Sequence, residues 1–195
     1  EREYVSSSEQ LLAFIDAHPE RKYDLGRAWS LHSYNLLQQG KTEQARTANE
    51  TSFELRRHLR SPAVTETYLR SAQIDMAIMR YGDALAAAQQ GMLMLIENPR
   101  IYANLNLYAA KALQKLGRTE EADAYFSTAR DVLLIEVGTT AEAYAQLLYQ
   151  GALMREERQA YAEAFTLVAT AYYAAQEPLF RARLLIKAYQ LYQLK

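Results

Sequence analysis

Apolar side chains recur along the chain at the spacing of helix faces, in stretches that short polar turns separate. Near the N-terminus, Ser8 suits a helix cap and precedes an apolar set formed by Leu11, Leu12, Phe14 and Ile15. Alternating runs of Val, Ile and Thr, which are typical of strands, are nearly absent. The pattern therefore predicts an all-α chain of about ten helices, near residues 7–17, 23–39, 42–58, 63–80, 82–97, 100–116, 119–136, 140–158, 161–175 and 179–193.

One local pattern occurs four times: a turn residue or aromatic, two mostly polar residues, then an alanine that opens a second helix. The alanines are Ala45, Ala84, Ala122 and Ala164, which are 39, 38 and 42 residues apart. Twelve residues before each alanine stands a small residue, namely Ser33, Ala72, Ala110 or Ala152. Antiparallel helices joined by a tight turn approach closely only where side chains are short. Each copy therefore predicts one closely packed helix pair.

The breaks between these helices have local causes. Gly40 and Gly117 suit the left-handed conformation that ends a helix. Pro62, Pro99 and Pro178 fall between successive pairs, where one helix must stop and the next can start.

On these residues the sequence resembles the tetratricopeptide-repeat family. The matching positions are Trp29, Ser33, Gly40 and Ala45 in the first unit, Tyr68, Ala72, Tyr81, Ala84 and Pro99 in the second, Ala110, Leu113, Gly117, Ala122, Phe126 and Ala129 in the third, and Ala152, Tyr161, Ala164 and Ala171 in the fourth. The resemblance implies a right-handed superhelical array of antiparallel helix pairs, an α-solenoid. The stretched repeats resemble those of bacterial signalling and transcription regulators.

Two features depart from the family pattern. The period exceeds the usual 34 residues, which predicts longer helices or looser links. Asp75 and Arg155 occupy a position that the family normally keeps apolar. Either the register slips by a residue there, or those helices pack unusually.

The domain organisation follows from the repeat. We expect a single repeat domain over residues 1–195, with a half-unit at 1–22, repeats at about 26–61, 65–99, 103–138 and 145–178, and a C-terminal helix at 179–195. The chain begins with Glu1, and its first helix resembles the second member of a pair. We therefore interpret the sequence as a piece of a larger protein.

Charge and composition narrow the range of possible functions. The net charge is −1, from 22 basic and 23 acidic residues, which argues against a dedicated nucleic-acid binder. The absence of cysteine excludes disulfides and a thiol nucleophile and fits the cytoplasm and the periplasm alike. No apolar run reaches membrane-spanning length, and no stretch has the pattern of a signal peptide.

No catalytic constellation is recognisable. His18, His32 and His58 are scattered and lack metal-ligand spacing, and no nucleophile elbow, phosphate loop or dinucleotide fingerprint is present. We therefore expect a protein that is not an enzyme and needs no cofactor or metal.

The resemblance implies a binding groove, because in this family the first helix of each pair lines the concave face. Carried over residue by residue, the groove candidates are Tyr34, Gln73, Lys111, Lys115, Tyr149 and Glu156. Lys111 and Lys115 are four residues apart and project from one helix face. A groove that combines aromatic, basic and acidic side chains suits an extended peptide or a partner helix. The alternative is that these positions are ordinary solvent-exposed ones, or that another part of the parent protein fills the groove.

The family's clamp for chaperone tails is not expected here. It needs Lys and Asn at groove positions where this chain has Ser30, Tyr34, Glu66 and Arg70.

Two further groups of side chains are candidate contact surfaces. Tyrosine occurs 15 times, and a possible interface is formed by Tyr172, Tyr173, Tyr189 and Tyr192, although tyrosines also fill interhelix space in such repeats. A basic cluster combines Arg56, Arg57, His58 and Arg60 with Arg70. Cations at a helix C-terminus explain this cluster better than a phosphate site does.

Two functions remain in view. The first is a sensor or scaffold module that binds a protein, a peptide, a small effector or an attached domain of its own chain through the groove. The second is an architectural module that stacks on its parent protein or forms a homodimer through the tyrosine-rich C-terminal face, with no separate ligand.

Overall fold

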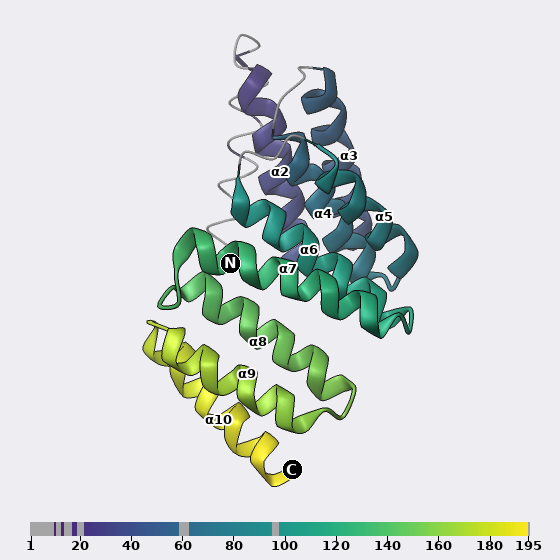
Figure 1. Cartoon of the computed structure of the whole chain (residues 1–195). Coiled ribbons are helices and arrows are strands. Elements are labelled where there is room, and N and C mark those ends of the chain that lie inside the picture. Colours follow the sequence, from purple (N-terminus) through teal and green to yellow (C-terminus); the bar gives the residue numbers. More distant parts are fainter. Residues whose placement is uncertain are drawn as a thin grey trace. The chain divides into compact units, whose positions relative to one another are not determined.

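The computed structural model describes residues 10, 13, 17–18, 22–58, 63–94 and 98–194. Every regular element in these ranges is an α-helix: α2 (Lys22–Gln38), α3 (Thr42–His58), α4 (Val64–Ala77), α5 (Tyr81–Met92), α6 (Pro99–Lys115), α7 (Thr119–Val137), α8 (Glu142–Glu157), α9 (Tyr161–Ala174) and α10 (Pro178–Leu194) (Figure 1). The all-α prediction is confirmed. Helices α4 and α5 end earlier than predicted, and the helix predicted at 7–17 lies almost wholly outside the described residues.

The two helices of each pair are joined by the same turn in all four copies. Its central residue has a positive φ of 73° at Gly40, 61° at Met79, 78° at Gly117 and 60° at Gln159. In each copy the next backbone N–H donates to a carbonyl oxygen five residues earlier, at 2.8 to 3.0 Å. This is the Schellman geometry that ends helices. The structural repeat therefore follows the sequence repeat, with glycine in two turns and a side-chain-bearing residue in the other two.

The predicted small residues lie where the helices of a pair meet. All eight are buried, with exposed fractions of 0 or 1%. Ser33 adds a hydrogen bond to this close approach, because its Oγ donates to the carbonyl oxygen of Ala45 at 2.7 Å. Close packing of α2 on α3 therefore depends on both the size and the polarity of this serine.

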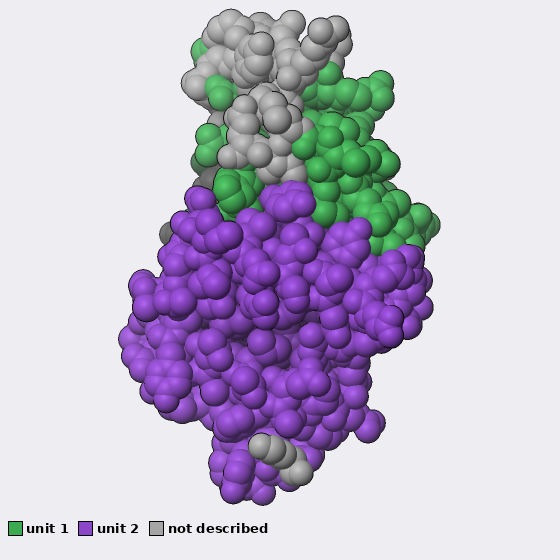
Figure 2. Space-filling view, viewed as in Figure 1, with its two compact units in different colours: residues 1–101 green, residues 102–195 purple. Residues whose placement is uncertain are grey.

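The chain divides into two compact units, residues 1–101 and residues 102–195 (Figure 2). In unit 1, α2 packs on α3, α3 on α4 and α4 on α5, and the first helices α2 and α4 also touch. In unit 2, α7 packs on α8, α8 on α9 and α9 on α10. Each unit is thus a stack of antiparallel helix pairs.

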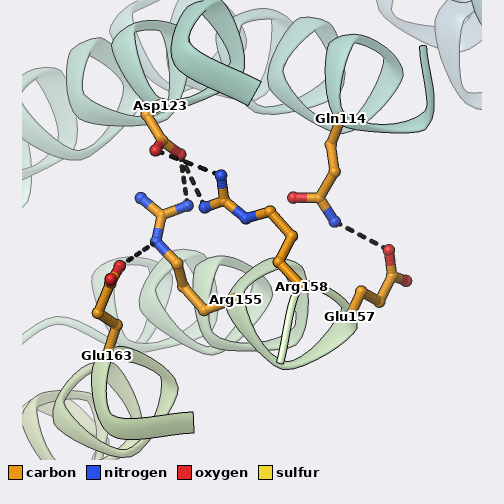
Figure 3. A network of polar contacts seen from close by, with 6 residues as sticks. All are labelled: Gln114, Asp123, Arg155, Glu157, Arg158 and Glu163. Carbon is orange, nitrogen blue, oxygen red and sulfur yellow. Dashed lines mark hydrogen bonds and ion pairs between the residues drawn. The ribbon is translucent and has the colours of Figure 1, made fainter. Parts of the chain in front are cut away.

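The charged residues at normally apolar positions are explained by partners on the preceding helix. Asp75 Oδ1 lies 2.9 Å from Arg46 Nη2 of α3. Arg155 Nη1 lies 2.5 Å from Asp123 Oδ1 of α7, and Arg155 also pairs with Glu163 (Figure 3). Since the turn geometry is regular in both pairs, the register does not slip. The helices pack around an ion pair instead.

Candidate binding face on the first helices

The first helices of unit 2 bring polar side chains together across α6 and α8. Lys111 Nζ of α6 donates to Gln150 Oε1 of α8 at 2.5 Å. One turn further along, Gln114 Nε2 donates to Glu157 Oε2 at 2.9 Å (Figure 3). Lys115 Nζ donates to the same oxygen at 2.8 Å. We call these five residues the α6–α8 row.

The α6–α8 row keeps an accessible end and an unused acceptor. The side chains of Lys115 and Glu157 are 39% and 51% exposed. Gln114 Oε1 is buried and accepts no hydrogen bond. Because a buried acceptor without a donor is costly, this oxygen favours a donor that comes from outside the row.

Lys111 has an unusually low pKa for a lysine. Burial lowers the pKa of its ammonium group to about 8, and the nearby Glu157 carboxylate opposes this shift only in part. Its Nζ also lies 5.1 Å from the centre of the Tyr108 ring. Lys111 is therefore mostly charged at pH 7 and loses its proton as the pH rises through about 8.

The two α8 candidates face α10 instead. The rings of Tyr149 and Phe180 meet edge to face, with centroids 5.8 Å apart. Lys187 Nζ donates to both Glu156 carboxylate oxygens, at 3.1 and 2.9 Å. Tyr149 and Glu156 therefore hold α8 and α10 together, a role that the sequence pattern did not indicate.

In unit 1, Tyr34 and Gln73 meet at one arginine. The Arg70 guanidinium lies 4.5 Å from the centre of the Tyr34 ring, and Arg70 Nη1 donates to Gln73 Oε1. Tyr34 is 40% exposed. Arg70, which the sequence places at a groove position and in the basic cluster, was not chosen as a groove candidate, although it stands three residues before Gln73 on the same helix face.

The candidate interface tyrosines divide into two kinds. Tyr172 is half-buried, with the Arg181 guanidinium 4.6 Å from its ring centre and the Tyr173 ring 5.6 Å away. Tyr173, Tyr189 and Tyr192 are 81, 67 and 65% exposed. Tyr172 thus joins α9 to α10, and the other three are available for contact.

Within the basic cluster, Arg56 has a structural role. Arg56 is buried, donates to the Ala63 carbonyl oxygen at 2.7 Å and pairs with Glu66 at 2.9 Å. It links the end of α3 to the start of α4. The side chain of His58 and the whole of Arg60 lie outside the described residues.

Two kinds of feature are absent from the described residues. No group of three or more His, Cys, Asp or Glu side chains among them could hold a metal ion. In the same part of the chain, no helix combines the length and the apolar character that crossing a bilayer requires.

The comparisons with known proteins bear on the fold. No protein-family model matches the chain, and no curated protein matches it. Among solved structures, the chain is similar to the crystal structure of BtubC (BKLC) from P. vanneervenii, with a TM-score of 0.78. The match covers 99% of this chain and 83% of that chain, at 15% sequence identity. At such an identity the likeness shows the fold alone, which is all-helical.

Proposed function

We propose that the chain is a tetratricopeptide-like binding module of a bacterial regulatory or signalling protein, and that it binds a peptide segment on its first helices. The observation that carries this proposal is the α6–α8 row. It places Lys111, Lys115 and the unused amide oxygen of Gln114 on one face, beside the exposed side chains of Lys115 and Glu157. The family resemblance and the four identical turns support the repeat class to which such a face belongs.

The chemistry of the row favours a peptide that carries a carboxylate. The ammonium groups of Lys111 and Lys115 can each donate more hydrogen bonds than they make within the chain. Gln114 Oε1 suits a peptide backbone N–H. Glu157 keeps the row from attracting anions without discrimination. An extended segment with one acidic side chain therefore matches the row in both charge and hydrogen bonding.

An architectural module that stacks on its parent protein or on a second copy is the other candidate. The exposed apolar side chains of α10 favour it, and they lie apart from the α6–α8 row.

The binding proposal is tested with peptides selected from a random displayed library. We expect the selected peptides to be acidic and to bind Lys111→Gln/Lys115→Gln at least about tenfold more weakly, since charge-assisted hydrogen bonds contribute roughly 1.5–3 kcal/mol each. Lys41→Gln, which changes an exposed lysine of unit 1, is the matched control. Fluorescence anisotropy gives the affinities. Tyr149→Ala is a poorer probe, because it would loosen α10.

The pH dependence provides a second readout. As the pH rises from 7 to 9, Lys111 loses its charge, and the affinity for an acidic peptide should fall several-fold. Lys111→Gln should remove this dependence. Peptides that bind wild type and the double variant equally, with a flat pH profile, would show that the row is not the binding site.

A further inference from the structure

Helix α10 is apolar on two opposite sides. Leu184 and Leu191 are fully buried against the rest of unit 2. At 100° per residue, the opposite side holds an exposed set, with exposed fractions of 53 to 67% at Leu185, Ile186, Tyr189 and Tyr192. We call this set the α10 stripe. A helix that is apolar on both sides is typical of a helix covered on both sides.

The stripe repeats a register that already serves helix packing in this chain. Counted from the first residue of each helix, Leu185, Tyr189 and Tyr192 hold the places that Tyr149, Leu153 and Glu156 hold in α8. That α8 edge packs against α10 through the Tyr149–Phe180 ring contact and the Glu156–Lys187 ion pair. The α10 stripe is therefore shaped to receive another helix.

The charge pattern shows what kind of helix fits. The α6–α8 and α8–α10 contacts both include ion pairs, Lys115–Glu157 and Lys187–Glu156. The stripe itself carries no charge, and Lys187 points to Glu156 on the other side of α10. A complementary helix must therefore present uncharged Leu, Ile and Tyr side chains.

Among the described residues, α10 is the helix that exposes such a set. The other exposed large apolar side chains stand singly or in small groups, such as Met79, Leu93 and Ile135. We propose that the α10 stripe binds the α10 stripe of a second copy, in an antiparallel two-fold pair centred near Tyr189. A two-fold contact needs a self-complementary surface, and an uncharged stripe meets this need.

Electrostatics permit this arrangement. Arg183 lies six residues from Tyr189, about 9 Å along the helix axis. The two copies' Arg183 side chains would stand about 18 Å apart along the axis, beyond the ~8 Å screening length at physiological salt.

The expected affinity is modest. The stripe would bury about 500 Å² on each copy, if each side chain loses its exposed part. This is below the ~800 Å² per partner of a standard interface. We therefore expect a weak dimer whose population depends on concentration.

Sedimentation velocity over roughly micromolar to millimolar concentrations tests the association. Wild type should shift from monomer to dimer, and Ile186→Glu or Tyr189→Glu should raise the midpoint at least about tenfold. Ile135→Glu, which alters an 87% exposed side chain of α7, should leave it unchanged. A wild type that stays monomeric, or a dimer that both stripe variants leave intact, would overturn the proposal.

Crosslinking tests the two-fold geometry, and the chain suits it because it contains no cysteine. Tyr189→Cys should form a disulfide-linked dimer under mild oxidation, and Ile135→Cys should not. Head-to-tail stacking would instead give open-ended oligomers without a link through residue 189, and this result would overturn the two-fold pair. The stripe contains none of the α6–α8 row, so peptide binding and dimer formation succeed or fail separately.

Discussion

At the scale of single residues, the contact between Phe126 of α7 and Gly151 of α8 shows how tightly the two successive helix pairs of unit 2 fit together. A Cβ added at Gly151 would lie 2.1 Å from Phe126 Cζ, and Phe126 is 2% exposed. The equivalent places in unit 1 hold Asn49 and Ser71, and Asn49 Nδ2 donates to Ser71 Oγ at 2.8 Å. The same contact between helices is made by a ring on a glycine in one unit and by a hydrogen bond in the other.

A Gly→Ala substitution ordinarily stabilises a helix. The tight fit at Gly151 predicts the opposite sign for the change in the free energy of unfolding. Gly→Ala in a helix gains about 0.5–1 kcal/mol, but overpacking a filled core typically costs about 1–3 kcal/mol. We expect Gly151→Ala to lower the free energy of unfolding by about 1 kcal/mol or more in urea denaturation. Gly82→Ala in α5, where an added Cβ meets nothing within 4 Å, should instead raise it slightly. Equal stabilisation by both changes would show that the Phe126 ring yields without cost.

At the scale of helices, the contacts α3–α4 and α7–α8 use the same two positions with opposite charges. Arg46 and Asp123 each follow a repeat alanine, and Asp75 and Arg155 each stand three residues after a small repeat residue. The ion pairs are therefore Arg46–Asp75 in one contact and Asp123–Arg155 in the other. If α3 packed on α8 by mistake, Arg46 would meet Arg155. The reversed polarity disfavours incorrect stacking of repeats.

The reversal predicts the behaviour of a charge swap in unit 1. Burial raises the pKa of the Asp75 carboxyl, and the Arg46 charge opposes this shift, so the pair depends on both members. Asp75→Arg or Arg46→Asp alone should lower the free energy of unfolding by about 1–3 kcal/mol. The double variant should recover most of the loss, because it recreates the polarity of the α7–α8 contact. Denaturation of all four proteins gives the coupling energy, and additive losses would contradict the pairing.

The sequence predicted what local rules decide. Small residues at the repeat positions and glycines in two turns follow from steric limits within a few residues, so the helices and their pairing could be predicted. The partners of Asp75 and Arg155 could not, because each lies on another helix about thirty residues away. A signal was present nonetheless, since the residue after the repeat alanine is Arg46 in one case and Asp123 in the other. Two groove candidates, Tyr149 and Glu156, were placed on the first helix correctly, but their contacts with α10 depend on packing.

At the scale of the whole molecule, the two units differ in what they bury. Eight of the nine buried polar or charged side chains among the described residues belong to unit 1: Ser30, Ser33, Asn35, Asn49, Ser52, Arg56, Thr65 and Thr67. The described part of unit 1 buries three apolar side chains larger than alanine, namely Leu36, Ile74 and Leu85. In unit 2 they are Leu105, Leu107, Leu113, Phe126, Leu133, Tyr144, Leu147, Leu148, Met154, Val168, Leu184 and Leu191.

This difference predicts separate unfolding of the two units. A buried aliphatic or aromatic side chain contributes about 1.5–3 kcal/mol, against about 1 kcal/mol net for a hydrogen bond. Unit 2 should therefore be the more stable, and a stack held by neighbour contacts can unfold in parts. Trp29 is the chain's one tryptophan and packs on the core of unit 1. In urea, its fluorescence should change at a lower concentration than the midpoint of the helical circular dichroism signal, which reports both units.

Two core variants distinguish separate unfolding of the two units from a single broad transition of the whole chain. Ile74→Ala removes a side chain from the core of unit 1 and should move the Trp29 transition to lower urea by itself. Leu148→Ala changes a side chain of unit 2 that is 1% exposed. It should move the later part of the circular dichroism transition to lower urea and leave the Trp29 midpoint in place. If either variant shifted both signals together, the chain would be one cooperative block. The polar core of unit 1 would then draw its stability from unit 2 and not from its own contacts.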